Sequence, residues 1–478
     1  MTETLERELK FDVGPRFRLP KLPGEPLPRR MFVSVYYDSP GHCLARHGVT
    51  VRRRTEKRRH RWQVKLPRGA ARLELEMPGE PTVIPPDLRR LLSVYIRGAD
   101  LAPIATLLTR RSGVLVRDLR GPVAEVVLDS VSVFEDRRVA QRFREVEVEL
   151  VGGDEQELER LGAMLRAGGA TDSDGRPKVF RVLGLDFFAH PEPLGPSASA
   201  VDHVLAMLRA QLDAVRAHDP GTRLGRDPEE LHQMRAGVRR LRAILRAARS
   251  LLEAGGSEAL REELAWLNTA LGGRRDLDVL RDYLTTELAT LDPPERRGGQ
   301  RLVRRLDEER ERAGQTLLTV LDTPRYFTLL DRIEELLAHP PLTGTEMSLR
   351  DLAAEEFRKL RKAVKALPEV PSDEDLHAVR IKAKRARHAA ELAVPVEGRP
   401  AERFVSKAKR LQDILGEHQD AVVAASRLHE LFAGARGRRA GFVAGRLVER
   451  QRTRRQAARQ AFQAFWPKVE GRGRKAWA

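Results

Sequence analysis

The sequence predicts an α+β protein of two parts, a strand-rich N-terminal part and an all-helical C-terminal part. Before residue 195, apolar and polar residues alternate in many segments, which is the period of β-strands. After residue 200, apolar residues recur three and four positions apart, which is the period of amphipathic helices. The segment AHPEPLGPSASA between them is rich in Pro, Ser and Ala, as linkers are. We therefore expect a strand domain over residues 1–190, a linker over 191–200 and a helical domain over 201–470.

The composition indicates folded domains and a polyanionic partner. The 478 residues are 41% hydrophobic, which argues against intrinsic disorder. Lys and Arg number 87 against 69 Asp and Glu, a formal net charge of +18. On composition alone, nucleic acid is the first candidate partner, followed by phosphate polymers and anionic lipid surfaces.

The cysteine count and the hydropathy pattern exclude several classes of protein. Cys43 is the single cysteine, so an internal disulfide and a cysteine-rich zinc site are excluded. The sequence contains no run of about 20 apolar residues that could cross a bilayer, and its first residues lack the apolar core of a signal peptide. We therefore expect a soluble, cytoplasmic protein without a membrane partner.

Charged residues occupy one face of several predicted strands. LERELKF places Glu6, Glu8 and Lys10 on one face and its apolar residues on the other. Taken alone, this is also the pattern of an ordinary amphipathic strand with its charges in water. The same alternation recurs, however, at Arg52, Arg54, Lys65, Glu74, Glu76, Glu145, Glu147 and Glu149. If the apolar faces pack outward against helices, a closed sheet would have a lumen lined by carboxylates and by Lys and Arg.

A lumen that carries both charges suits a metal ion together with a phosphate chain. Carboxylates that repel one another need a hard cation such as Mg²⁺ or Mn²⁺, whose preferred ligands are oxygens. Lys and Arg suit phosphate oxygens, and Arg can bind them in a bidentate fork. A metal ion and a phosphate chain would neutralise both sets of side chains.

These residues resemble the CYTH domain family, the triphosphate tunnel metalloenzymes, over about residues 1–190. The N-terminal ExExK signature of that family is matched by Glu6, Glu8 and Lys10. The resemblance continues in order through YYDSP, VRRR, WQVKL, RLELE, TRR, VVLD, REVEVE and RPKVFR. It implies a closed antiparallel tunnel that binds a tri- or polyphosphate with Mg²⁺ or Mn²⁺, and a metal-dependent hydrolase of the inorganic triphosphatase type.

The resemblance also implies roles for individual residues. The metal would be held by Glu6, Glu8, Glu145 and Glu147, with Asp129 in support. The phosphates would be bound by Lys10, Arg52, Arg54, Lys65, Arg111 and Lys178. The catalytic group would comprise Glu6, Glu8, Lys65, Glu74 and Glu76, with Glu74 and Glu76 supporting the metal or positioning water. In TRR, either arginine could bind phosphate, and strand parity with Thr109 favours Arg111 over Arg110.

The helical part repeats itself. LHQMRAGVRRLR begins at Leu231 and LHAVRIKAKRAR begins at Leu376, an offset of 145 residues, and LGGRRD from Leu271 is echoed by LGEHQD from Leu415 at 144. Two echoes at nearly one offset indicate a duplicated helical unit, with copies over about 201–340 and 345–470. We expect helix breaks at Gly255-Gly256, Gly272-Gly273, Pro293-Pro294 and Pro340-Pro341, and a mobile C-terminal tail.

Each copy carries a basic stripe that begins with a histidine. At about 100° per residue, the charged residues of each copy fall on one face of a helix. The stripes are His232, Arg235, Arg239, Arg242 and Arg246 in the first copy and His377, Arg380, Lys384 and Arg387 in the second. Such a face could instead be solvated and paired with Glu from neighbouring helices. Residues 231–249 contain no Asp or Glu, however, and two facing stripes would follow a linear polyanion.

These residues resemble the CHAD family, the conserved-histidine α-helical domain, over about residues 200–470. The match is carried by HxxRxxxRRxR from His232, HxxRxxxKRxR from His377 and LGxxRDxDVL from Leu271. The resemblance implies two four-helix bundles related by pseudo-twofold symmetry that bind inorganic polyphosphate between them. Lys384 departs from the Arg of the pattern, which keeps the charge but loses the fork, and LGEHQD departs from LGxxRD.

Three functions follow from these patterns. The first is hydrolysis of tripolyphosphate or polyphosphate in the tunnel, with long-chain polyphosphate bound by the helical part. The second is a non-catalytic polyphosphate-binding protein that targets polyphosphate granules. The third, binding of nucleic-acid backbones, ranks last because neither basic repeat contains an aromatic residue for stacking. Adenylate cyclase and thiamine triphosphatase activities, which occur in the tunnel family, also rank lower because the sequence shows no base-recognition pocket.

Overall fold

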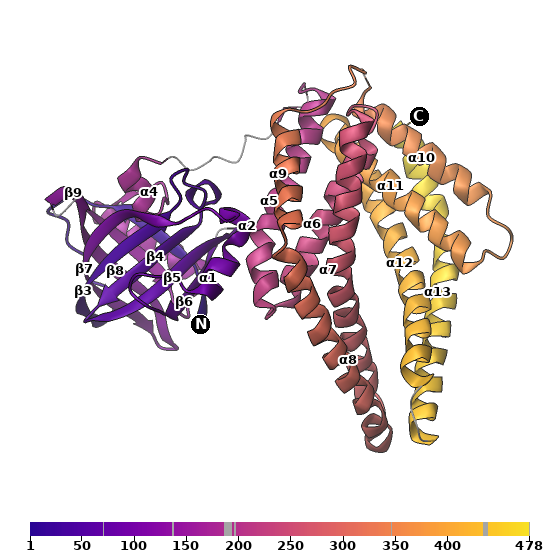
Figure 1. Cartoon of the computed structure of the whole chain (residues 1–478), viewed down its shortest axis with the longest axis horizontal. Helices are drawn as coiled ribbons and strands as arrows, with labels where there is room; N and C mark the ends of the chain where they lie inside the picture. The colour runs from indigo at the N-terminus through magenta and orange to yellow at the C-terminus, as the bar shows by residue number, and fades with distance from the viewer. Residues whose placement is uncertain are drawn as a thin grey trace. The chain divides into compact units, whose positions relative to one another are not determined.

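A computed structural model describes residues 1–69, 71–135, 138–185, 194–195, 197–345, 347–433 and 438–477 (Figure 1). The chain divides into two compact units, residues 1–190 and 191–478, each described by itself below. Of the linker predicted over 191–200, residues 191–193 and 196 lie outside the described part. Every described helix is too short or too polar to span a bilayer.

The N-terminal unit is built on a ten-stranded antiparallel sheet. Its strands are β1 Thr2–Glu6, β2 Glu8–Asp12, β3 Gly24–Asp38, β4 Thr50–Glu56, β5 Arg59–Arg68, β6 Ala71–Pro78, β7 Ala102–Asp118, β8 Gly121–Glu135, β9 Arg138–Leu150 and β10 Thr171–Asp172. They are ordered β1-β6-β5-β4-β3-β7-β8-β9-β2-β10.

The prediction of a closed sheet is wrong, because the order of hydrogen-bonded strands begins at β1 and ends at β10. The reason lies at Arg7, where one N-terminal segment changes partner. Glu6 in β1 pairs with Arg72 in β6, whereas Glu8 in β2 pairs with Glu149 in β9. The same N-terminal segment therefore supplies β1, which is one edge of the sheet, and β2, which lies next to β10 at the other edge. Among the described residues, no hydrogen-bonded ladder joins β1 to β10. Side chains from both ends of the order nevertheless line one cavity.

Helices cover the apolar faces of the strands. Helix α3 (Glu155–Ala167) packs Leu161 and Leu165 against Phe11 and Val146. Helix α4 (Lys178–Leu183) packs Phe180 into a second buried cluster with residues of β3, β7 and β8. Two short helices, α1 (Pro86–Leu91) and α2 (Ser93–Ile96), and the 3₁₀ turn Ala45–His47 complete the unit. The apolar residues therefore pack beneath helices, and the charged residues of the same strands face the cavity.

The described part of the C-terminal unit contains nine helices (Figure 1). They are α5 Ala200–Leu224, α6 Pro228–Ala247, α7 Ala254–Ala289, α8 Pro293–Leu321, α9 Pro324–Ala338, α10 Leu349–Lys365, α11 Asp373–Glu397, α12 Arg399–Ala433 and α13 Arg438–Trp477. Consecutive helices pack together from α5 to α8 and from α10 to α13. The two repeated basic segments form α6 and α11, and these two helices contact each other.

The break expected at Gly272-Gly273 does not occur, whereas Gly255-Gly256 lie in the first turn of α7, next to a helix boundary. Helix α7 continues through Gly272-Gly273, and the missing side chain of Gly272 makes room for the Arg235 guanidinium, 3.1 Å from where a Cβ would lie. The expected mobile tail is instead the end of α13, where Val469 is buried and the Trp477 ring lies 5.8 Å from that of Phe404. The Pro pairs do mark boundaries: Pro293 begins α8, and Pro340-Pro341 lie between α9 and α10.

Candidate functional site

A cavity of about 790 Å³ in the N-terminal unit is lined almost entirely by charged residues. Alternation along the strands brings every second side chain to this face. The lining contains eleven Lys and Arg and eight Glu, and its described residues include one apolar side chain, Pro177. Eleven predicted site residues line the cavity: Glu6, Glu8, Lys10, Arg52, Arg54, Lys65, Glu74, Glu76, Arg111, Glu147 and Lys178. Arg110, the alternative to Arg111, is exposed instead.

Glu6 and Glu74 form a buried carboxyl pair on one side of the cavity. Burial and the hydrogen bond with Glu74 raise the pKa of Glu6 to about 8. Burial opposes ionisation of Glu74 as well, but the hydrogen bond from Glu6 and the charges of Lys65 and Arg52 lower its pKa to about 2. Lys65 Nζ contacts Glu6 and lies 3.1 Å from Glu74 Oε2. Two carboxyl groups within hydrogen-bond distance of each other need a shared proton or a cation between them, because two negative charges repel at that distance.

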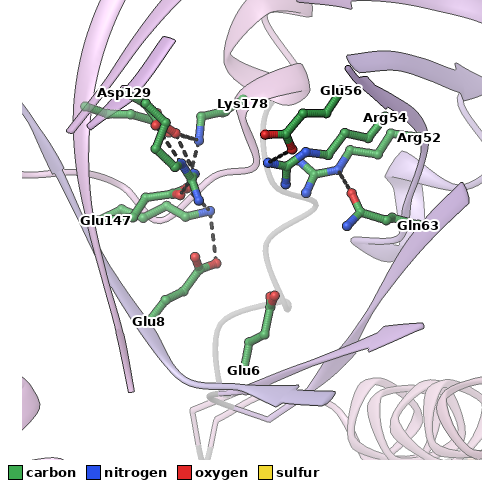
Figure 2. Close-up of polar contacts among 12 residues, drawn as sticks. Glu6, Glu8, Arg52, Arg54, Glu56, Gln63, Asp129, Glu147 and Lys178 are labelled. Atoms are coloured by element: carbon green, nitrogen blue, oxygen red, sulfur yellow. Dashed lines mark hydrogen bonds and ion pairs between the residues drawn. The ribbon is translucent and has the colours of Figure 1, made fainter. Parts of the chain in front are cut away.

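Gln63 orients the carboxylates beside this pair. Its Nε2 donates to Glu74 Oε1 at 2.7 Å and to Glu76 Oε2 at 3.0 Å. Its Oε1 accepts a hydrogen bond from Arg52 Nε at 2.8 Å, which Figure 2 shows. One neutral amide therefore fixes two carboxylates and one guanidinium.

A second group of carboxylates lies across the cavity and surrounds Lys178. One oxygen from each of Asp129, Glu145 and Glu147 lies within 4.8 Å of the others, a spacing that could hold a metal ion. Lys178 Nζ lies 2.8, 2.6 and 2.9 Å from these three residues, respectively. Arg111 forms a fork with Asp129 at 2.8 and 2.6 Å and also contacts Glu147 at 2.6 Å. Lys178 and Arg111 therefore already balance the charge of two of these three carboxylates.

The predicted metal ligands are distributed over separate contacts rather than gathered at one point. Glu6 belongs to the pair with Glu74, and Glu8 lies 3.0 Å from Lys10 Nζ. Lys10 Nζ is also 3.8 Å from Glu147 and links Glu8 to the Lys178 cluster. Asp129 and Glu145 are buried behind the cavity lining and do not belong to it.

Arg54, on another part of the cavity wall, is not fully engaged by carboxylates. The Arg54 guanidinium lies over the Phe32 ring, 3.5 Å from its centroid. Burial and the charges of Arg52, Arg30 and Arg111 lower the pKa of Arg54 to about 10. Its Nε and Nη2 are buried without a hydrogen-bond partner among the described residues, although Glu56 lies 3.6 Å from Nη2. Such a guanidinium is a binding site for an anion.

Sequence reasoning missed several residues of the lining. Gln63 and Arg72 share strand parity with Lys65 and Glu74, so the period-two pattern could have found them. Arg30 could not be found in this way, because an irregularity between Leu27 and Arg30 shifts the register of β3 against β7.

A second basic cavity, of about 340 Å³, lies in the helical unit between α6, α7, α10 and α11. Both repeats contribute to it. From the predicted stripes it contains Arg239, Arg242, Arg246, Arg380 and Lys384, and Arg261 and Arg385 add two more cations. Glu356 is the one acid in its described lining. The cavity therefore joins the two stripes into a single cationic surface.

Mutual repulsion of the cations lowers pKa values in this cavity. Burial and the charges of Arg239, Arg380 and Arg387 lower the pKa of Lys384 to about 8. Burial and the charges of Arg387 and Lys384 lower the pKa of His388 to about 3, so this histidine is neutral. An anion bound here would relieve the repulsion.

The other stripe residues lie outside this lining. His377 Nδ1 is 2.7 Å from Gln419 Oε1, and Arg235 forms an ion pair of 2.6 Å with Asp276. Gln419 and Asp276 belong to the LGEHQD and LGGRRD echoes, which therefore orient stripe residues. The stripe residues absent from the lining are His232, Arg235, His377 and Arg387.

Comparison with known proteins confirms the family. A CYTH domain model matches residues 4–169, and a CHAD domain model matches residues 206–429. The uncharacterized protein MT2285 of Mycobacterium tuberculosis (strain CDC 1551 / Oshkosh) is 30% identical over 513 residues, which cover 99% of this chain and 98% of that protein. The chain therefore belongs to the proteins in which a CYTH domain is followed by a CHAD domain. Members of the CYTH family are metal-dependent, bind triphosphate substrates and act as triphosphatases or cyclases.

Two solved structures are similar to part of the chain. PptA from Streptomyces chartreusis is 27% identical with a TM-score of 0.49, covering 57% of this chain and 100% of that chain. The CHAD domain from the plant Ricinus communis is 26% identical with a TM-score of 0.48, covering 57% of this chain and 93% of that chain.

Proposed function

We propose that the N-terminal unit hydrolyses inorganic tripolyphosphate and the ends of polyphosphate chains with Mg²⁺ or Mn²⁺, and that the helical unit binds inorganic polyphosphate. The observation that carries the first half is the lining of the larger cavity, where eleven cations face eight carboxylates. A phosphate chain with a divalent ion neutralises both sets. The described lining offers Tyr36 as its one aromatic side chain, and its hydroxyl is engaged by Arg52 at 3.2 Å.

The carboxyl pair of Glu6 and Glu74 fits a divalent metal ion. Their oxygens are the donors that Mg²⁺ and Mn²⁺ prefer, and the pair needs a cation wherever it loses its proton. Glu6 and Glu74 would hold the ion. When bound, it supplies charge neutralisation for the phosphate oxygens and a more acidic water.

The protein's own residues bind and orient the chain. Arg52, Arg54 and Arg111 supply forked donors, and Lys10 and Lys65 supply point charges beside the carboxylates. We assign to Asp129, Glu145 and Glu147 the holding of Lys178 and Arg111 toward the substrate. Glu76, fixed by Gln63, orients the water that attacks the terminal phosphorus. The bond from the terminal phosphorus to the bridging oxygen breaks, orthophosphate forms, and the shortened chain leaves with charge on that oxygen, which these cations stabilise.

Phosphate release tests the enzymatic half. The full chain should release phosphate from tripolyphosphate with Mg²⁺ or Mn²⁺, and Glu6→Gln should lower kcat/KM by about 100-fold or more. Glu3→Gln is the matched control, since Glu3 lies on the same strand, is exposed and is absent from the lining. Undiminished release by a folded Glu6→Gln protein would contradict the assignment. A parent chain that binds tripolyphosphate with metal but never cleaves it would favour the binding-only function.

The meeting of both basic stripes in one cavity supports polyphosphate binding by the helical unit. Arg380→Ala should weaken binding of long-chain polyphosphate about ten-fold, because it removes a forked donor from the cavity wall. Arg332→Ala, an exposed change on α9, should leave the Kd within about two-fold of the parent. Competition decides between polyanions: long-chain polyphosphate that failed to displace RNA or DNA at equal phosphate concentration would favour the nucleic-acid function.

A further inference from the structure

We propose that the β4–β5 hairpin, residues 56–61, is an outer phosphate-binding segment that selects chains longer than tripolyphosphate. This inference rests on the proposed hydrolysis in the larger cavity and concerns which substrates that cavity processes best. The hairpin contributes Glu56, Lys57, Arg59 and Arg61 to the cavity lining.

One face of β5 carries polar side chains from Arg59 to Lys65. Arg59, Arg61, Gln63 and Lys65 alternate along the strand and all line the cavity, whereas Trp62 and Val64 on the other face are buried. At about 3.3 Å per residue, Lys65 and Arg59 lie about 20 Å apart along the strand. A tripolyphosphate held beside Lys65, Arg52 and the carboxyl pair is too short to reach the outer end of this row. A longer chain bound at the same place would extend along it.

The turn of the hairpin has a backbone that its residues do not favour. Lys57 and Arg58 have φ values of 47° and 63°, in the left-handed region. Two-residue turns of this kind favour Asn-Gly, because a Cβ is unfavourable there. Two cations at these positions therefore oppose the local backbone preference, as is common where a segment serves a ligand.

Two cations of the hairpin are left for an anion. Glu56 is already engaged by Arg30 at 2.9 and 2.6 Å, and Glu76 is contacted by Arg61. Among the described residues, Lys57 and Arg59 form no ion pair. The hairpin thus has more positive charge than its own carboxylates neutralise.

A second hollow borders the hairpin. This hollow, of about 380 Å³, shares Arg59, Arg61 and Glu76 with the larger cavity, and His60 lies on it as well. A phosphate chain that extends past Arg61 therefore has space beside the two arginines that the hollow and the cavity share.

The experiment compares two substrates on one protein. The full chain and the double variant Lys57→Asn/Arg59→Gln are assayed with tripolyphosphate and with long-chain polyphosphate at equal concentrations of chain ends. Asn suits the left-handed turn, so the hairpin should keep its shape. We expect the ratio of kcat/KM for long chains to kcat/KM for tripolyphosphate to fall about ten-fold, equivalent to about 1.4 kcal/mol. The helical unit is the same in both proteins and cancels from the comparison.

The control removes the same charge from another turn of the sheet. Arg117→Gln/Arg120→Gln changes the β7–β8 turn, which does not line the cavity, and should keep the parent ratio. An equal loss with both substrates, no loss with either, or a larger loss with tripolyphosphate than with long-chain polyphosphate would each overturn the proposal. If the parent cleaves no tripolyphosphate, the proposed hydrolysis fails. In that case the Kd values of the parent and the double variant for long-chain polyphosphate and for tripolyphosphate, measured by calorimetry, test the role of the hairpin separately.

Discussion

At the residue scale, Lys384 is the most pH-sensitive cation of the helical cavity. It stands where the first repeat has Arg239, and its pKa is lowered to about 8 by burial and by the charges of Arg239, Arg380 and Arg387. An arginine at this position would stay protonated under the same repulsion, since its ordinary pKa is higher. The departure from the Arg of the pattern therefore gives this site a titrating group.

Polyphosphate binding should weaken as pH rises through the pKa of Lys384. Below about pH 8 Lys384 is already charged in the free protein, so binding takes up no proton there. Above that pH the bound polyanion must draw a proton onto Lys384, and affinity should fall by up to about ten-fold per pH unit. Calorimetric Kd values between about pH 7 and about pH 9.5 should show this fall in the parent and not in Lys384→Arg.

Lys382→Arg, on the same helix but outside the lining, should keep the pH dependence of the parent. The assignment to Lys384 is wrong if both arginine variants show the same slope as the parent.

The sequence predicted much of the site, because strand parity assigns inward-facing residues without knowledge of the strand order. Parity combined with the CYTH resemblance reached Glu6, Glu74 and Arg111. It could not show that Glu6 pairs with Glu74 while Asp129 lies behind Lys178, because those contacts depend on which strands are neighbours. Arg30 also depends on a register irregularity in β3, which has no signal in the sequence.

At the element scale, α4 acts as a short anchor that places Lys178. Its first residue carries the ammonium group among three carboxylates, and Phe180, two positions later, is buried with Tyr36 and Leu107. A helix of six residues has little stability of its own, so this packing holds it in place.

Phe180→Ala should therefore reduce both stability and activity of the N-terminal unit. Loss of a buried Phe costs about 3–5 kcal/mol, which calorimetry would record as a lower melting temperature for this unit. Even at temperatures well below that melting temperature, the variant should release phosphate from tripolyphosphate more slowly than the parent, because Lys178 loses its support. Phe17→Ala, which changes the cluster under α3, should destabilise the unit while keeping KM close to the parent value. If Phe180→Ala and Phe17→Ala change KM equally, the claim that α4 places Lys178 is wrong.

Elements were predicted well where the periodic pattern is strong and poorly where packing overrides local preference. The alternation in REVEVE became β9, and the repeated basic segments became α6 and α11. Gly272 would end an isolated helix, but within α7 it gives room to Arg235. Gly473 likewise lies against the Phe357 ring within α13, where a Cβ would come within 2.2 Å. These glycines serve contacts between helices, which a single segment cannot reveal.

At the scale of the whole molecule, part of the net charge of +18 lies on two surfaces of different kinds. The larger cavity mixes cations with carboxylates and suits a metal-bound phosphate chain. The smaller cavity has a single acid among many cations and suits a polyanion without a metal. The proposed function gives both surfaces the same ligand, inorganic polyphosphate, and predicts that one unit binds a long chain while the other processes its end.

This division predicts that the helical unit lowers the KM for long chains only. A polymer held by one unit raises the effective concentration of its ends for the other, whereas tripolyphosphate is too short to be held in this way. Arg239→Ala/Arg380→Ala should therefore raise KM for long-chain polyphosphate about ten-fold, with kcat and the KM for tripolyphosphate unchanged. Arg312→Ala/Arg332→Ala, two exposed changes on α8 and α9, provide the matched loss of charge. If KM for long chains stays the same in the cavity variant, the two units act on polyphosphate independently.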